Sequence, residues 1–326
     1  QGGENATLTD ANLILGYLDP EFFLGGSMTL NKEAAHETTK DNLAQPLNLS
    51  TTRTAWGIHE TASEDIARAF RIHAAERGFD YRGATMIAFG GSGPLHAMSV
   101  ASKLKIPRVV FPIGAGVYSA LGLLASPLSF ELSRSRRVIL EDIDEKVFCS
   151  HFLPLIEETS YSLKEAGVED GQISITCQLE ARYFGQTHEI VVVLPNNNLM
   201  ELFSDVRSLF EKRYSEVYSF AAIDAPIEII NWKVIASGTE PVFKMSYGLQ
   251  VDDKQKSNPV KGKREVYIGP SGYELAPVYD RYLLSKGMEI NGPAIIEERE
   301  STCFITPGSR AVVDQSSNVV AELDVF

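Results

Sequence analysis

The sequence predicts an α/β fold in its first part and a mixed α/β and β-rich region after it. Between residues 85 and 124 the order strand, glycine loop, helix occurs twice in succession, which is typical of parallel strands joined through helices. From residue 174 apolar and polar residues alternate with a period of two, which is typical of strands with one buried face. The chain shows no internal repeat and no low-complexity tract.

Two helices are predicted before the first strand. The first is expected within residues 33–47, ending near Pro46. Thr61 and Glu64 have the spacing of a capping box, so a second helix is expected to begin at Thr61. Gly78 follows its apolar stripe and is expected to end it in the left-handed conformation.

The two glycine loops are the sharpest local features. A buried strand is expected over 85–89, followed by a glycine loop at 90–93 and a helix that begins near Pro94. A second buried strand at 108–112 leads through a second glycine loop at 114–116 into a helical segment. Parallel pairing of the two strands follows from this arrangement.

The composition changes near Pro127, and we place a domain boundary at residue 135, giving domains 1–135 and 136–326. The strand at this boundary contains three arginines, Arg134, Arg136 and Arg137. The simplest interpretation is that their side chains are exposed to solvent at the edge of a sheet. The remaining elements up to residue 236 are predicted as a strand at 128–140, a helix at 148–166, a hairpin of 174–183 with 188–194, a helix at 199–214 and a strand at 227–236. Residues 240–326 are predicted to form short strands, with an exposed loop at 252–263.

Composition excludes several classes of protein. The 326 residues contain 43 acidic and 30 basic side chains, for a formal charge of −13, which disfavours binding to nucleic acid or to a membrane surface. The three cysteines include no CxxC pair, so neither a disulfide framework nor a cysteine zinc site is expected. No apolar run is long enough to cross a bilayer. These features predict a cytoplasmic protein.

The first glycine loop is a candidate ligand site. Gly90, Gly91, Ser92 and Gly93 join a strand to the N-terminus of a helix, where exposed amides and the helix dipole suit a nucleotide or another anion. The loop is neither a Walker A motif nor a complete dinucleotide fingerprint, because His96 stands where the third glycine would be. The alternative is a tight turn packed against a neighbouring segment.

Two further side chains are candidate metal ligands. His96 lies in the first turn of the helix, where the dipole disfavours a cation, so a neutral imidazole could bind metal or accept a hydrogen bond; the alternative is a structural histidine. Asp10 could reach a metal-bound nucleotide; the alternative is a helix N-cap formed by Thr9 or Asp10. No catalytic residue can be assigned from the sequence.

Several strings resemble the later part of the hydantoinase A / 5-oxoprolinase / acetone carboxylase family. Motif order and spacing agree along essentially the whole chain. The strings are TDANLILG (9–16), AFGGSGPLHA (88–97), GVYSALGLL (116–124), ARYFGQTHEIVVVLP (181–195), PIEIINWKVIASG (226–238), PVYDR (277–281), NGPAIIEE (291–298) and STCFITPG (301–308).

The resemblance implies one lobe of an actin/sugar-kinase/Hsp70-like ATPase fold, followed by the family's α/β and β-rich C-terminal domain. It also implies ATP and a divalent metal ion such as Mg²⁺, with Gly90, Gly91, Ser92, Gly93 and Ser119 at the nucleotide and Asp10 and His96 near the cleft. Members activate a cyclic amide or ketone with ATP. A hydantoinase B-type subunit or domain usually completes the chemistry.

The chain departs from the family pattern in two places. The phosphate-gripping GGT-type turn near the family's N-terminus is absent, so an N-terminal ATPase lobe is an expected partner. Where the family shows a His-Glu-Arg-Arg-Tyr-Gly run, this chain has Tyr214 and Ser219 in place of the histidine and the glycine.

The resulting hypothesis is the C-terminal part of an ATP-dependent hydrolase of small cyclic amides, inactive by itself because both lobes must position the phosphates and metal. The alternatives are a non-catalytic assembly subunit that docks the nucleotide lobe, an ATP-dependent carboxylase subunit of the same family, and a small-molecule domain that binds no nucleotide.

Overall fold

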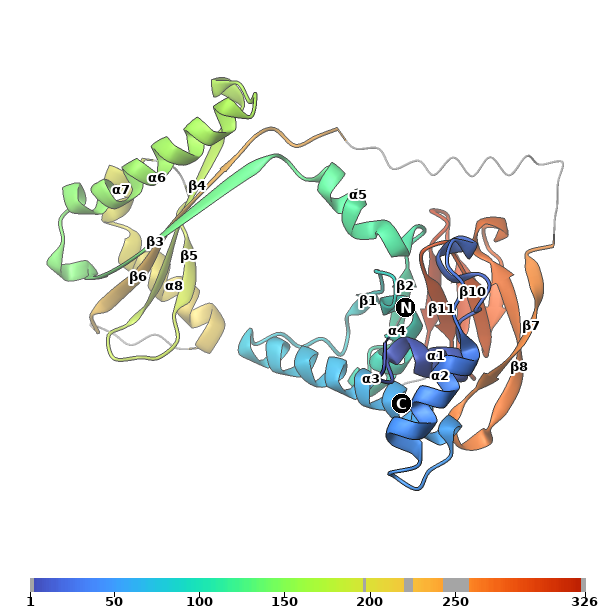
Figure 1. Ribbon diagram of the computed structural model, residues 1–326. Coiled ribbons are helices and arrows are strands. Elements are labelled where there is room, and N and C mark those ends of the chain that lie inside the picture. The colour runs from blue at the N-terminus through green and yellow to red at the C-terminus, as the bar shows by residue number, and fades with distance from the viewer. Residues whose placement is uncertain (1–2, 196–197, 220–224, 243–257, 324–326) are drawn as a thin grey trace. The chain divides into compact units, whose positions relative to one another are not determined.

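The computed structural model describes residues 3–195, 198–219, 225–242 and 258–323 (Figure 1). They form two compact units, one from the described residues of 1–122 and 245–326 and the other from those of 123–244. This division differs from the predicted boundary at residue 135. The last part of the chain returns to the first unit because β13 (Val319–Glu322) pairs with β2 (Arg108–Phe111), and local periodicity cannot reveal such a distant pairing.

The first unit contains two sheets and the N-terminal helices. One sheet has the order β1-β2-β13-β12-β9 and the other the order β11-β10-β8-β7. β1 and β2 pair in parallel, as predicted. The further elements are α1 (Leu8–Ile14), α2 (Lys32–Thr39), α3 (Thr51–Glu76), β1 (Thr85–Ile87), α4 (Gly93–Leu104), α5 (Tyr118–Ala125, which runs past the end of the unit), β7 (Val260–Tyr267), β8 (Tyr273–Asp280), β9 (Glu289–Asn291), β10 (Ala294–Glu297), β11 (Thr302–Ile305) and β12 (Arg310–Val313).

The core of the first unit joins both ends of the chain. The apolar face predicted for α4 is buried, from Leu95 to Leu104, and packs with side chains of β2, β10 and β13. A second cluster joins α1 to the other sheet, where the amide of Tyr267 donates to the carbonyl of Leu15 at 2.9 Å. The N-terminal helices are therefore fixed by residues from the C-terminal part of the sequence.

The second unit is an antiparallel sheet with helices packed against it. Its strand order is β3-β6-β4-β5, and its core centres on the buried Trp232, against which Phe148 and Phe152 pack edge-on. The predicted hairpin of β4 with β5 is present, and β3 is an edge strand on which the three boundary arginines are exposed. The elements are β3 (Ser129–Ile139), α6 (Glu145–Glu165), β4 (Ser174–Tyr183), β5 (Ile190–Val193), α7 (Leu199–Phe203), α8 (Val206–Tyr218) and β6 (Ile227–Ser237).

Two N-terminal predictions were wrong in detail. Helix α3 begins ten residues before Thr61, because Ser50 accepts a hydrogen bond from the amide of Arg53 and the helix continues through Gly57 without a proline. Gly78 ends it with φ of +62°, as predicted. Strand β1 is not buried, since the side chain of Ile87 is 56% exposed.

Two later predictions also need correction. The helix expected over 199–214 is two helices, α7 and α8. The predicted loop at 252–263 lies outside the described residues up to 257, and from Val260 onward its place is taken by strand β7.

Candidate functional site

The first glycine loop joins β1 to α4 as an open turn. Gly90 has φ of +91°, a conformation that favours glycine, and its amide donates to the carbonyl of Ala115 at 2.8 Å. Helix α4 has Pro94 in its first turn, and its N-cap residue Ser92 makes no side-chain cap. Within the described part of the chain, the amides of Gly91 and Ser92 have no hydrogen-bond partner. They are therefore free to bind a ligand.

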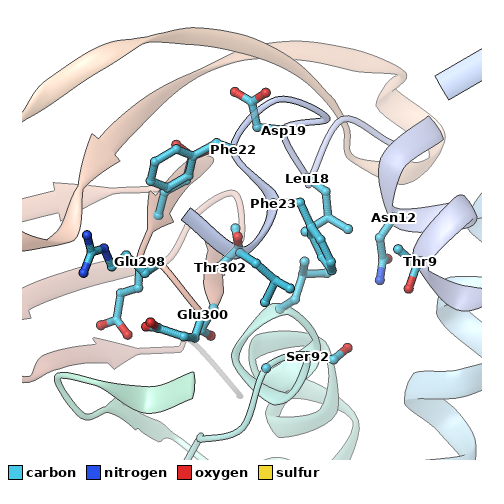
Figure 2. A pocket seen from close by; sticks show the side chains of 16 residues that line it. Thr9, Asn12, Leu18, Asp19, Phe22, Phe23, Ser92, Glu298, Glu300 and Thr302 are labelled. Carbon is cyan, nitrogen blue, oxygen red and sulfur yellow. The ribbon is translucent and has the colours of Figure 1, made fainter. Parts of the chain in front are cut away.

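A cavity of about 240 Å³ lies against this loop. Figure 2 shows that its wall comes from segments far apart in the sequence: Thr9 and Asn12 of α1, residues between 18 and 24, Ser92 beside Gly91, and the turn at 297–302. Phe22 and Phe23 provide apolar surface, and backbone and carboxylate groups provide polar surface. A mostly apolar hollow with a few convergent polar groups is typical of a small-molecule site.

The acidic side chains at one end of the cavity are compensated. Glu297 is buried and accepts from Lys261 at 2.6 Å and from Arg264 at 2.7 Å, and Arg264 also contacts Asp19 at 2.7 Å. The ammonium of Lys261 lies 3.4 Å from the ring centroid of Phe22. This network fixes the segment that contains Asp19 and Phe22 against strands β7 and β10 without leaving a net negative charge.

Glu298 also lines the cavity and forms a buried ion pair. Its carboxylate accepts from Arg281 at 2.9 Å, and Arg281 also donates to the carbonyls of Phe111 and Ser317. Burial raises the pKa of Glu298, and the Arg281 guanidinium and the amides of Ala115 and Gly114 oppose this shift. The carboxylate is thus directed toward the second glycine loop.

A chain of neutral hydrogen bonds lies beneath the first loop. Asn12 accepts from Nδ1 of His59 at 2.9 Å and donates to Nε2 of His96 at 3.3 Å, and Nδ1 of His96 faces the hydroxyl of Ser63 at 3.2 Å. The two imidazoles stack with centroids 4.4 Å apart. Burial lowers the pKa of His59 to about 3 and of His96 to about 4, and their mutual repulsion further lowers that of His59. Both rings are neutral at pH 7.

Comparison with known proteins assigns the chain to a family. A model described as "Hydantoinase/oxoprolinase" matches residues 1–131, and one described as "Hydantoinase/oxoprolinase C-terminal domain" matches residues 145–319, more than half of the chain. The chain belongs to the hydantoinase/oxoprolinase family. This confirms the resemblance inferred from the sequence motifs.

Family relatives are similar along nearly the whole chain. An uncharacterized protein of Methanocaldococcus jannaschii is 36% identical over 97% of this chain and 44% of that protein. The caprolactamase subunit alpha of Pseudomonas jessenii is 30% identical over 97% of this chain and 46% of that subunit. The chain therefore spans about half the length of these curated relatives.

Solved structures of the family share the mixed α/β fold. The structure of an ATP-dependent caprolactamase from Pseudomonas jessenii has a TM-score of 0.73 and 27% identity, over 98% of this chain and 47% of that one. The nucleotide-free structure of acetone carboxylase, from a study of ATP-dependent acetone carboxylation, has a TM-score of 0.70 with the same coverage. At 21% identity the second similarity shows the fold alone.

The structure separates the residues that the family resemblance places at the nucleotide. Gly91 and Ser92 line the cavity, whereas Gly93 lines a groove on the other side of the loop, together with Ser92. Gly90 contacts the second glycine loop instead. Ser119 is exposed on α5 and is not a lining residue of this cavity.

At both candidate metal ligands of the family comparison, atoms that could bind a metal take part in hydrogen bonds: Oδ2 of Asp10 and both ring nitrogens of His96. The carboxylate of Asp10 accepts from the amide and the hydroxyl of Thr7, at 2.8 and 2.6 Å, and completes a capping box in which Thr7 is the N-cap. Both ring nitrogens of His96 face hydrogen-bond partners. Among the described residues no group of three His, Cys, Asp or Glu side chains could hold a metal ion, so the described part of this chain does not supply a complete metal site by itself.

Sequence reasoning missed the buried polar residues around the loop. Asn12, Arg281, Glu297 and Glu298 all lie within the family motifs quoted above, so their positions in those motifs were the available signal. His59 and Ser63 lie four residues apart on α3 and had no such signal.

Ser219 stands where the family's His-Glu-Arg-Arg-Tyr-Gly run has its glycine. It adopts the left-handed conformation, with φ of +64°. None of the helices in the described part of the chain is both long and apolar enough to span a membrane.

Proposed function

We propose that this chain forms the C-terminal half of an ATP-dependent enzyme of the hydantoinase/oxoprolinase family that hydrolyses a small cyclic amide. Relatives named caprolactamase and 5-oxoprolinase, and the ATP-dependent solved caprolactamase, support the reaction class. The lengths of the relatives support a nucleotide site shared with an N-terminal half. A hydantoinase B-type subunit or domain is the expected further partner.

The observation on which this proposal rests is that Gly91 and Ser92 line the cavity and that their amides have no partner among the described residues. Gly91 and Ser92 can donate to a ligand without a side chain in the way, and the N-terminus of α4 lies directly behind them. The carboxylate of Glu300 lies in the same wall and would repel a triphosphate. The loop is therefore better suited to the adenosine part of ATP than to its phosphates.

The role of this half is to bind and orient. When bound, ATP supplies the phosphoryl group that activates the amide oxygen of the substrate ring. Gly91 and Ser92 hold one end of the nucleotide, and Phe22 and Phe23 exclude water from it. The described residues offer no metal site, so the phosphate-binding groups and any metal ligands belong to the other half under this proposal.

The proposal is tested by calorimetric titration with Mg-ATP and by an ATPase assay. The chain alone is expected to show no turnover. Mixing it with the segment of the caprolactamase subunit alpha of Pseudomonas jessenii that lies outside the matched region should restore binding and turnover. Turnover by the chain alone would contradict the proposal, and a stable complex without ATP binding would favour the non-catalytic assembly subunit.

A loop variant assigns the binding to the cavity. Gly91→Leu places a side chain at the mouth of the loop and should weaken ATP binding to the assembled enzyme at least tenfold. Gly83→Leu is the control, because an added Cβ at Gly83 has no atom within 4 Å, one at Gly91 meets only the Glu300 carbonyl oxygen at 3.5 Å, and Gly83 does not line the cavity. Equal affinity for both variants would exclude the cavity as the nucleotide site.

The carboxylase branch is the second candidate, because acetophenone carboxylase gamma subunit is 30% identical over 98% of this chain. A substrate panel separates the branches. Cyclic amides such as caprolactam, 5-oxoproline and hydantoin should stimulate ATP turnover of the assembled enzyme if it is a hydrolase. Stimulation only by a ketone together with bicarbonate would place it among the carboxylases.

A further inference from the structure

A second hollow lies on the other side of the glycine loop and is apolar. We call it the edge groove. Its principal side chains are those of Ile66 and Phe70 of α3, Ile87 of β1, and Phe89, and Gly93 at the start of α4 also lines it. Its volume is about 380 Å³. Ile66, Ile87 and Phe89 are each 46–56% exposed. Such a cluster of half-exposed large apolar side chains on a globular unit is typical of an interaction surface.

Strand β1 forms one side of the edge groove and has a free edge. It is the terminal strand of its sheet, paired only with β2 among the described residues. Edge strands in proteins are commonly protected by charged side chains, prolines or bulges. β1 has none of these, because its residues are Thr85, Met86 and Ile87. Its outer backbone groups are therefore available to pair with another strand.

The groove contains no charged side chain, although the chain has 73 charged Asp, Glu, Lys and Arg residues. Apart from Ser92 and His96 its lining is apolar or glycine, and His96 is neutral at pH 7. An apolar strand therefore fits the groove better than a charged peptide or a nucleic acid does. A covering strand would also lie directly beside the glycine loop, since Ser92 lines both hollows.

We infer that the edge groove binds an apolar β-strand from the N-terminal half of the enzyme, which pairs with β1 and packs on Ile66 and Phe70. This inference rests on the proposed function, because that half is the partner proposed there. The curated relatives are about twice as long as this chain, so they contain a further segment of the size needed to cover such a surface. Docking here would close the glycine loop on its second side.

Thiol labelling tests this inference, since all three native cysteines are buried. Ile87→Cys reports on the edge groove, and Ile72→Cys is the matched control, because Ile72 is 54% exposed on α3 and does not line the groove. In the chain alone both thiols should react with iodoacetamide at similar rates. With the N-terminal segment of the Pseudomonas jessenii subunit added, labelling at position 87 should slow at least tenfold while labelling at position 72 is unchanged.

The other outcomes separate the two proposals. If size-exclusion chromatography shows a complex but position 87 remains reactive, the edge groove is not the docking site and the shared-enzyme proposal survives. If no complex forms, the proposed partnership fails, and this inference fails with it. If position 87 is protected in the chain alone and the mass is that of a dimer, a second copy covers the groove and the inference is wrong.

Discussion

The two glycine loops have similar sequences and opposite structural roles. Around Gly90 and Gly93 there is no atom within 4 Å of an added Cβ, and the loop faces a cavity. At Gly116 an added Cβ would lie 2.5 Å from Cβ of Glu300 and 2.7 Å from its carbonyl oxygen. The first loop needs glycine for an open turn and the second needs it for close packing.

The polar groups that support the two loops also differ. Beneath the first loop lies the neutral chain of His59, Asn12 and His96, whereas the second loop faces the buried carboxylate of Glu298, which is paired with Arg281. The second loop thus lies against a side chain of the same protein, whereas the amides of Gly91 and Ser92 in the first loop have no partner among the described residues. A glycine-rich turn before a helix does not by itself indicate binding; what fills the space in front of it does.

Among the substitutions proposed here, removing Arg281, the partner of Glu298, should lower the free energy of unfolding most. Arg281→Met leaves a buried carboxylate without its compensating charge, and we expect the free energy of unfolding to fall by about 3–5 kcal/mol. Urea denaturation followed by circular dichroism measures this loss. Replacing both partners, as Arg281→Met with Glu298→Leu, should recover most of it; a double variant as unstable as the single one would mean that the pair does more than balance charge.

Adding a methyl group to the second glycine loop should cause the second-largest loss of stability. Gly116→Ala forces the turn at Glu300 to move, with an expected loss of about 3 kcal/mol from overpacking. Gly93→Ala is the control in the first loop, where the space is open, and should change stability by less than about 0.5 kcal/mol. Similar losses in the two variants, measured by the same denaturation, would contradict the contrast between the loops.

Acidification should weaken the neutral support of the first loop. Because the folded pKa of His96 is about 4 and its ordinary value is 6.5, the unfolded chain binds more protons between these values and stability falls as the pH falls below 6.5. The expected loss in the free energy of unfolding is about 1.6 kcal/mol from pH 6.5 to pH 5. His96→Gln should remove this part of the pH dependence, and His73→Gln, at an exposed position on α3, should keep the wild-type slope. An unchanged slope in His96→Gln would exclude a neutral buried histidine.

The smallest loss of stability is expected for a substitution at Gly90. Gly90→Ala meets no neighbouring atom, but φ of +91° is unfavourable for any residue with a side chain, so a loss of about 1 kcal/mol is expected. Thermal denaturation can resolve it. A loss as large as that of Gly116→Ala would show that the first loop is packed rather than open.

Local signals predicted much of the fold. Pro94, the buried stripe of α4 and the parallel pairing of β1 with β2 follow from apolar spacing and turn residues that lie within forty residues of one another. The division into units did not follow, because the pairing of β13 with β2 joins segments more than two hundred residues apart. Burial of β1 was predicted from its apolar composition, which cannot distinguish a core strand from an uncovered edge.

The candidate site was predicted only where its residues are adjacent in sequence. Gly91 and Ser92 were found because the loop is contiguous. The network of Glu297 with Lys261 and Arg264 joins two strands, β10 and β7, that are not neighbours in the sheet, and no spacing in the sequence reveals this. Asp10 and His96 have side chains typical of metal ligands, but Oδ2 of Asp10 accepts from Thr7, and the two ring nitrogens of His96 face Asn12 and Ser63.

The return of β13 to β2 also has a consequence for biosynthesis. The residues of the second unit form one contiguous stretch, so this unit can complete its sheet while the C-terminal segment is still inside the ribosome. The five-stranded sheet of the first unit cannot be completed until Glu322 has been translated. Helix α1 packs against side chains of β7, β8, β10 and β11, so its apolar face stays uncovered until residues 260–305 have been translated, and it can bind a chaperone during that time.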